Sequence, residues 1–415
     1  MPACPSDAYQ RPAWRKAAWK NEERSDHWFR AMKRDSERMT ERLRIAQVAP
    51  LYERVPPSLY GGTERVVAYL TDELVRRGHD VTLFASGDSK TTAKLIAPVP
   101  IALRLSGEAC DPLSAHVIEL SNVIEHADAF DIIHCHMDYP GFLVGRAVST
   151  PVLHTLHGRL DLPYLRPVFE QFRDTPIVSI SDAQRKPLRD LDLAWVGTVH
   201  HGLPLQRYVY SPEGGDYLAF LGRVAPEKRL DLAIAVAGRL GVPLRVAAKV
   251  DPADRVYFER EIRPYLNDPL IDFIGEIGDA EKPAFLGGAT ALLFPIDWPE
   301  PFGLVMIEAM ACGTPVVARP CGSVPEVMRP GVTGFVANTV DEMVDAVKRL
   351  HEIDRAGCRQ WVERQFSVER MTDDYERIYR AVLDREVRPG RRPDRAARSF
   401  GGIRGSDPPT GRRVA

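Results

Sequence analysis

Apolar, strand-like runs alternate with helix-like stretches twice along the chain, and this alternation limits the possible fold most strongly. The first series has runs at 44–49, 79–86, 131–136, 151–157, 176–181 and 195–201, and the second has runs at 217–222, 244–248, 271–274, 291–296, 315–318 and 334–336. Strands separated by helices form parallel sheets that are covered on both faces. The pattern predicts an α/β protein with two doubly wound, Rossmann-like domains. A ligand of such sheets binds beyond the carboxyl ends of the strands, so we expect the site in the cleft between the domains.

Changes in composition predict the domain boundaries. Residues 211–216 read Ser-Pro-Glu-Gly-Gly-Asp, which is typical of a linker. We therefore expect an N-terminal domain at 44–210 and a C-terminal domain at 211–385. Residues 1–43 show weak periodicity, and we expect an extension that is disordered or that follows a misassigned start. Residues 386–415 are rich in arginine, glycine and proline, and we expect a basic, disordered tail.

The overall charge excludes some function classes. The chain has 415 residues and a net charge of -2, so no global field attracts it to nucleic acid. No apolar run approaches the roughly 20 residues of a membrane span, and the N-terminus lacks the apolar core of a signal peptide. We expect a cytoplasmic protein without a nucleic-acid partner. Peripheral membrane contact through Trp14, Trp19 and Trp28 is the alternative, although their spacing does not hold one helical face.

A short motif follows the first strand of each half: two glycines in the first half and two cations in the second. Gly61 and Gly62 open the first helix, where a ligand can approach the backbone and the helix N-terminus favours an anion. Arg223 and Lys228 flank a loop between a strand and a helix, which suits a diphosphate. The alternatives are a glycine turn without a ligand and a solvated charged loop. The G-x-G-x-x-G fingerprint is absent from the glycine loop, which argues against a Rossmann oxidoreductase.

The most specific motif is a pair of glutamates, Glu300 and Glu308, which bracket an apolar stretch. Pro301 fits the first turn of a helix and Gly313 fits its C-terminal stop, so we expect free backbone N–H groups at 302–304 to face the cleft. Eight residues along a helix rise about 12 Å. A retaining glycosidase needs its carboxyl groups about 5–5.5 Å apart, so this pair is better suited to the two ends of an extended ligand.

Together these motifs resemble glycosyltransferase family 4, retaining enzymes of the GT-B fold, over residues 44–385. The Glu-x7-Glu arrangement carries the resemblance most specifically. The sequence departs from the family at Arg229, where a glycine usually follows the lysine, and at His201, where the family commonly has asparagine. We therefore assign no role to His201.

The resemblance implies roles for individual residues. Glu300 would hold hydroxyls of the donor sugar, and Glu308 would hold the ribose of the nucleotide. The implied catalytic residues are Glu300, Arg223, Lys228 and His157, the last lying near the transferred sugar. The implied donor-binding residues are Gly61, Gly62, Phe302, Gly303, Leu304, Glu308 and Lys249. His136 and Asp138 would line the acceptor side or act structurally.

The implied activity is retaining transfer of a hexose from a UDP- or GDP-sugar to an unidentified acceptor hydroxyl. The N-terminal domain would bind the acceptor and the C-terminal domain the donor. We expect no cofactor and no metal, because Arg223 and Lys228 can neutralise a diphosphate. Asp190 and Asp192 imitate the metal-binding Asp-x-Asp of other glycosyltransferases, but a solvated helix end explains them better.

Three other functions are possible. The first is a sugar-nucleotide epimerase on a similar two-domain scaffold, the second is the Rossmann oxidoreductase, and the third is an inactive carbohydrate-binding protein. Release of a nucleoside diphosphate from a sugar donor separates them from a transferase.

Overall fold

The computed structural model describes residues 41–107 and 111–387. The predicted N-terminal extension and basic tail therefore lie almost wholly outside the described residues. Within these ranges, none of the helices combines the length and the apolar character that crossing a membrane would require.

Two parallel sheets form the framework, as the alternating pattern predicts. The first sheet has the order β3-β2-β1-β4-β5-β6-β7 and the second has the order β10-β9-β8-β11-β12-β13. In each sheet the first strand in sequence lies inside the sheet, and the strand order reverses there, as in doubly wound folds. The predicted fold class is confirmed. The strands of the first sheet are β1 (Arg44–Val48), β2 (Asp80–Phe84), β3 (Lys94–Ile96), β4 (Ile132–Cys135), β5 (Val152–Leu156), β6 (Ile177–Ser179) and β7 (Trp195–Thr198). Those of the second are β8 (Tyr217–Arg223), β9 (Leu244–Lys249), β10 (Ile271–Gly275), β11 (Ala289–Phe294), β12 (Val316–Ala318) and β13 (Gly334–Val336).

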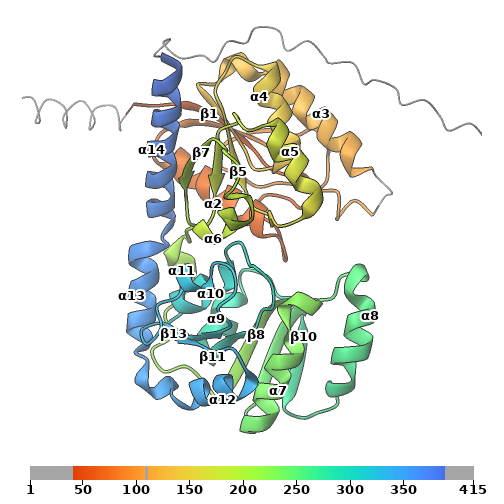
Figure 1. Cartoon of the computed structure of the whole chain (residues 1–415), viewed down its shortest axis with the longest axis vertical. Helices are drawn as coiled ribbons and strands as arrows, with labels where there is room; N and C mark the ends of the chain where they lie inside the picture. The colour runs from red at the N-terminus through yellow and green to blue at the C-terminus, as the bar shows by residue number, and fades with distance from the viewer. Residues whose placement is uncertain (1–40, 108–110, 388–415) are drawn as a thin grey trace, which may run out of the picture.

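Helices cover both sheets (Figure 1). The helices connected with the first sheet are α2 (Gly62–Arg76), α3 (Pro112–Glu125), α4 (Val144–Ala147), α5 (Arg166–Gln171) and α6 (Asp182–Arg185). Those of the second are α7 (Leu230–Leu240), α8 (Arg255–Tyr257), α9 (Lys282–Gly287), α10 (Leu304–Ala311), α11 (Val324–Val327), α12 (Val340–Lys348) and α13 (Arg355–Gln365). The last described helix is α14 (Val368–Val387).

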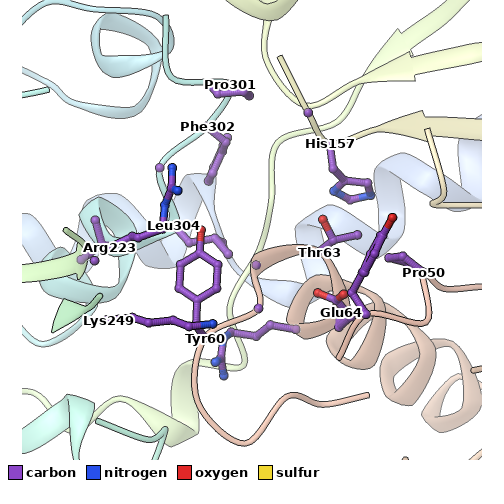
Figure 2. A pocket seen from close by; sticks show the side chains of 18 of the residues that line it. Pro50, Tyr60, Thr63, Glu64, His157, Arg223, Lys249, Pro301, Phe302 and Leu304 are labelled. Carbon is purple, nitrogen blue, oxygen red and sulfur yellow. The ribbon is translucent and has the colours of Figure 1, made fainter. Parts of the chain in front are cut away.

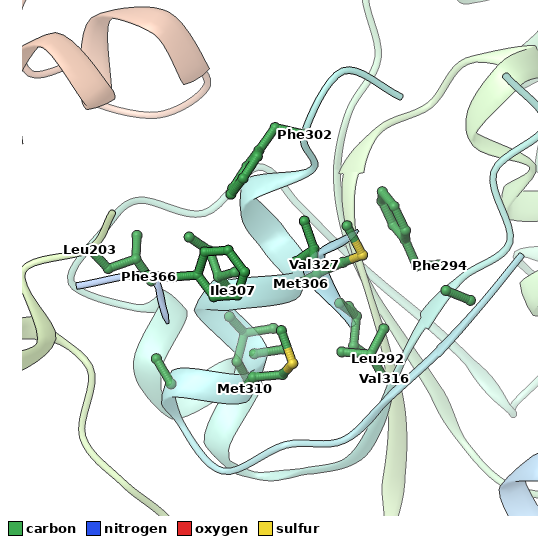
Figure 3. Close-up of a cluster of buried hydrophobic side chains, with 14 of the residues drawn as sticks. Leu203, Leu292, Phe294, Phe302, Met306, Ile307, Met310, Val316, Val327 and Phe366 are labelled. Atoms are coloured by element: carbon green, nitrogen blue, oxygen red, sulfur yellow. The ribbon is translucent and has the colours of Figure 1, made fainter. Parts of the chain in front are cut away.

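Helix α10 is the central element of the second core. Its residues from Met306 to Ala311 are all buried, because the helix is apolar on every side except at Glu308. Figure 3 shows its side chains among residues of the sheet and of the segments between the domains. The labelled members of this cluster are Leu203, Leu292, Phe294, Phe302, Met306, Ile307, Met310, Val316, Val327 and Phe366.

The chain crosses between the domains twice, and the two crossings contact each other. The N–H of Leu203 donates to the carbonyl of Phe366 at 2.8 Å, and the N–H of Val368 donates to the carbonyl of Leu203 at 2.9 Å. A Cβ atom at Gly202 would lie 2.2 Å from the carbonyl oxygen of Ser367, so only glycine permits this approach.

The second crossing changes the assignment of the C-terminal helix. The predicted boundaries place residues 211–385 in one domain, whereas α14 returns to the first sheet and runs along it (Figure 1). The hydroxyl of Tyr379 on α14 contacts Gln47 of β1 at 3.0 Å and His134 of β4 at 2.8 Å. The sequence does not reveal this return, because a pattern analysis assumes that a domain is one continuous stretch.

Glu376 on α14 anchors the helix to the first domain. Its carboxylate contacts His79 at 2.6 Å and Arg77 at 2.7 Å, and its side chain is 5% exposed. Burial by itself raises the pKa of Glu376, but the hydrogen bonds from His79 and Arg77 and the charge of Arg77 lower it below its ordinary value.

Replacing this carboxylate tests the anchor. We expect Glu376→Gln to lose about 2 kcal/mol or more of unfolding free energy at pH 7, because it leaves buried partners unpaired. A carboxyl with a lowered pKa stabilises the fold above its unfolded pKa, and the benefit is lost as the pH falls through the folded pKa. The difference from wild type should therefore shrink in acid, as read by urea unfolding. Glu352→Gln, which breaks an exposed pair with Arg349, is the matched control and should have a smaller effect.

Candidate active site

A cleft of about 980 Å³ lies between the carboxyl ends of the two sheets. All eleven residues predicted for catalysis and donor binding line it. Figure 2 shows Arg223, Lys249 and Leu304 on one side and His157 and Glu64 on the other. The structure therefore brings the predicted residues together, and their individual roles stay predictions.

Helix α10 begins later than the sequence suggested. Its first residue is Leu304 and its N-cap is Gly303, which has a φ of 79° in the left-handed region. The expectation that Pro301 occupies the first turn is wrong, because the helix cannot continue backwards through a left-handed residue. Glu300 therefore lies in the preceding loop, and the rise of a helix does not set its separation from Glu308.

Glu308 lies on α10, lines the cleft and is 3% exposed. Its carboxylate accepts hydrogen bonds from Tyr208 Oη and Lys282 Nζ, each at 3.0 Å. Burial by itself raises the pKa of Glu308, but the charges of Lys282 and Arg65 and these hydrogen bonds lower it below the ordinary value. The carboxylate is thus held ionised, and it can accept hydrogen bonds from a polar ligand.

Glu300 is paired with the predicted phosphate cation. Its Oε2 atom accepts a short hydrogen bond from Lys228 Nζ and another from Trp298 Nε1 at 3.0 Å. The Lys228 ammonium also lies 4.8 Å from the centre of the Trp298 ring, within the range of a cation–π contact. This group places an anion and a cation side by side in the lining of the cleft.

The other two predicted cations have acidic partners as well. Arg223 pairs with Asp254 at 2.7 Å and with Glu227 at 2.6 Å. Lys249 pairs with Asp251 at 3.2 Å and lies 5.5 Å from the Tyr60 ring. Figure 2 shows Tyr60 between the two sides of the cleft, next to Lys249.

The departure from the family at Arg229 has a physical explanation. Arg229 has a φ of 53°, a conformation that glycine adopts without strain and other residues at a cost of roughly 1–2 kcal/mol. Its guanidinium pairs with Asp231 at 2.8 Å and Asp297 at 3.1 Å. These ion pairs hold the arginine in the conformation that a glycine adopts freely.

The glycine loop approaches the second domain. A Cβ atom at Gly62 would lie 3.8 Å from a methyl carbon of Leu304, and the N–H of Tyr60 donates to Glu276 at 2.8 Å. Gly61 is the N-cap of α2 with a φ of 149°, so Thr63 lies inside the helix and does not cap it. The glycine loop and the start of α10 therefore border the same cleft.

His157 lies at the end of β5 and lines the cleft. Burial lowers its pKa to about 3, so the ring is neutral at physiological pH. Its Nε2 atom contacts His136 Nδ1 at 2.9 Å, and its ring stacks on that of His201 at a centroid distance of 5.4 Å. Asp138 accepts the backbone N–H of His157 at 2.8 Å. His136 and Asp138 thus both line the cleft and position His157.

Lys282 and Trp298 line the cleft, and Tyr208 contacts the lining residue Glu308 from behind. None of these three was identified from the sequence. Lys282 and Tyr208 lie in unremarkable patterns and reach Glu308 only through the fold, whereas Trp298, two residues before Glu300, could have been noticed as an aromatic residue beside the motif. Asp190 does not line the cleft and instead pairs with Arg166 on the surface at 2.6 Å. Across 41–107 and 111–387, three or more histidine, cysteine or acidic side chains nowhere gather as a metal site would require.

Glu64 is a buried carboxyl on α2, on the N-terminal-domain side of the cleft. Burial raises its pKa to about 7, and the charge of Glu53 adds to the shift. A carboxyl with a raised folded pKa destabilises the protein progressively as the pH rises from the unfolded pKa to the folded one.

Removing this charge should stabilise the protein at alkaline pH. We expect Glu64→Gln to gain on the order of 2–3 kcal/mol at pH 8 and almost nothing at pH 4, measured by urea unfolding. Glu73→Gln on the same helix is the control, and its effect should have the opposite sign. Burial by itself raises the pKa of Glu73, but Arg76 and Arg77 lower it below the ordinary value. This variant should therefore lose stability at pH 8. A pH-independent effect of Glu64→Gln would contradict the assignment.

Known proteins share both the sequence pattern and the architecture. A model of Glycosyltransferase Family 4 matches residues 60–207, and a model of Glycosyl transferases group 1 matches residues 207–365. D-inositol 3-phosphate glycosyltransferase of Mycobacterium leprae (strain Br4923) is 25% identical over 388 residues, covering 78% of this chain and 89% of the relative.

Solved structures agree with these matches. AviGT4, a glycosyltransferase involved in avilamycin A biosynthesis, is 25% identical with a TM-score of 0.63, covering 82% of this chain and 98% of AviGT4. HepE of Anabaena, solved with UDP and glucose, is 16% identical with a TM-score of 0.65, covering 82% of this chain and all of HepE. The adjoining family matches, the two facing sheets and the cleft between them place this chain among the group 1 glycosyltransferases of family 4, with the GT-B fold.

Proposed function

We propose that the protein is a retaining, metal-independent hexosyltransferase that moves a hexose from a UDP- or GDP-sugar to an acceptor hydroxyl. The observation that carries the proposal is the convergence of two buried carboxylates and two cations on one cleft. Glu300 and Lys228 form an ion pair in its lining, Glu308 lines it from α10, and Arg223 lies at the end of β8. The UDP and glucose bound by HepE are consistent with such a donor.

The donor would lie along the second domain. Glu308 suits the ribose, because an ionised, buried carboxylate can accept hydrogen bonds from two neighbouring hydroxyls. The diphosphate would then lie between Lys228 and Arg223 on one side and the N-termini of α2 and α10 on the other, where backbone N–H groups favour an anion.

The charge that develops in the reaction supports metal independence. Breaking the bond between sugar and phosphate leaves negative charge on the diphosphate, and preorganised cations and helix N-termini stabilise it where it forms. Arg223 and Lys228 are held in place by carboxylates in the structure. An ammonium has three N–H donors and a guanidinium has five, so each cation can contact a donor phosphate while it keeps its carboxylate partner.

Glu300 is better suited to binding than to nucleophilic attack. Its carboxylate is already hydrogen-bonded by Lys228 and Trp298, and this stabilises its charge and weakens it as a nucleophile. We therefore favour front-face transfer with retention, in which the departing phosphate oxygen accepts the proton of the acceptor hydroxyl. Retention itself is inferred from the family resemblance.

Slow donor hydrolysis, with water in place of the acceptor, tests this function. UDP-glucose and GDP-mannose are incubated with the protein in EDTA, and the released diphosphate and sugar anomer are followed by NMR. We expect one donor to release the α-anomer first and Lys228→Ala to be at least about a hundredfold slower. Release of the β-anomer first, or a strict requirement for Mn²⁺ or Mg²⁺, would refute retention or metal independence respectively.

The two glutamates should have different effects. We expect Glu308→Gln to weaken binding of the free nucleoside diphosphate by at least about tenfold, the equivalent of one charged hydrogen bond. Glu300→Gln should leave that affinity nearly unchanged and reduce turnover. Calorimetric titration of both variants measures the affinities, and melting curves verify that Glu308→Gln stays folded. Equal losses of affinity in two folded variants would contradict the division of roles.

A further inference from the structure

A continuous chain of hydrogen bonds connects His157 to helix α14. His157 Nε2 contacts His136 Nδ1 at 2.9 Å, and His136 Nε2 contacts Gln47 Oε1 at 2.8 Å. The other end of the Gln47 amide donates from Nε2 to Tyr379 Oη at 3.0 Å. Tyr379 Oη in turn lies 2.8 Å from His134 Nδ1. The four side chains from His136 to His134 are buried, so water does not compete for these contacts.

The order of donors and acceptors along this chain follows from the orientation of the Gln47 amide, which has Oε1 toward His136 and Nε2 toward Tyr379. An amide oxygen only accepts and an amide nitrogen only donates, so His136 must carry its proton on Nε2. Burial lowers the pKa of His136 well below its ordinary value, which leaves the ring neutral with a lone pair on Nδ1. The proton between the two rings must then belong to His157 Nε2.

The remaining nitrogen of His157 is the one that matters for a ligand. Its Nδ1 atom is buried and has no hydrogen-bond partner among the described residues, while the residue lines the cleft. A neutral ring with a proton on Nε2 has a lone pair on Nδ1 and can only accept a hydrogen bond there. A sugar hydroxyl is a donor that this site can hold.

We propose that Gln47 and Tyr379 are positioning residues that fix His157 as the Nε2–H tautomer, so that Nδ1 accepts a hydrogen bond from a hydroxyl of the transferred sugar. The inference rests on the proposed function for the identity of the sugar, whereas the tautomer itself follows from the hydrogen-bond chain. It gives α14 a role at the site that its position in the sequence does not indicate. With the opposite orientation of the Gln47 amide, donor and acceptor would change places in every hydrogen bond of the chain, and His157 Nδ1 would become a donor.

Long-range proton–nitrogen NMR of protein labelled with ¹⁵N at histidine tests the tautomer, and His157→Gln assigns the signal. In the wild type we expect His157 with its proton on Nε2. Tyr379→Phe leaves one end of the Gln47 amide without a partner, so we expect a mixture of tautomers. It should lower kcat for hydrolysis of the donor sugar by about five- to tenfold, the equivalent of one hydrogen bond. Affinity for the free diphosphate should stay the same.

Tyr375→Phe is the matched control. Tyr375 is on the same helix and is equally buried, but its hydroxyl contacts Thr155 Oγ1 at 3.1 Å and not Gln47. Thr155 Oγ1 lies 2.7 Å from His134 Nε2, so Tyr375 joins the chain only at the end that is remote from His157. It should leave both the tautomer and kcat unchanged. Gln47→Met removes the amide entirely and should reproduce the effect of Tyr379→Phe if that variant does not fold.

Two results would overturn the proposal. A wild-type His157 with its proton on Nδ1 contradicts it directly, whatever the variants show. An unchanged tautomer and kcat in folded Tyr379→Phe or Gln47→Met shows that the chain does not position the ring. Failure of the wild type to bind or hydrolyse any nucleotide sugar would instead refute the proposed function, because the NMR measurement needs no donor.

Discussion

The contact between the two crossings, at Leu203 and Phe366, is the constraint on which the rest of the structure depends. Two backbone hydrogen bonds join the segments, and Gly202 permits their close approach. Because the crossings are joined, the carboxyl ends of both sheets face one cleft. The same contact directs α14 back to the first sheet, where Tyr379 joins the residues beneath His157.

The cleft contains charges that already have partners. Lys228 pairs with Glu300, Lys282 with Glu308, and Arg223 with Asp254. Leaving a buried charge unpaired is expensive, so a site that must wait for a charged ligand is more stable when its own side chains are paired. Under the proposed function, this pairing also keeps the cations in place for the donor phosphates.

The hydrophobic pattern was sufficient to predict twelve strands of the two sheets, because buried parallel strands are short apolar runs between helices. It did not predict β3 (Lys94–Ile96), which has only three residues, of which Lys94 is exposed and the other two are partly exposed. It also placed the start of α10 at Pro301, since proline is common in a first turn. The left-handed Gly303 decides the true start, and a glycine in a sequence does not reveal its backbone angle.

The sequence by itself determined the two-sheet architecture and the positions of the charged motifs just beyond the strands, because both follow from residues that are close together along the chain. Only the tertiary structure decided how those residues are paired. Tyr208 and Glu308 are 100 residues apart, and Gln47 and Tyr379 are 332 residues apart, yet each pair shares a hydrogen bond. Local periodicity carries no information about such contacts, since they form only when the folded chain brings distant elements within about 3 Å.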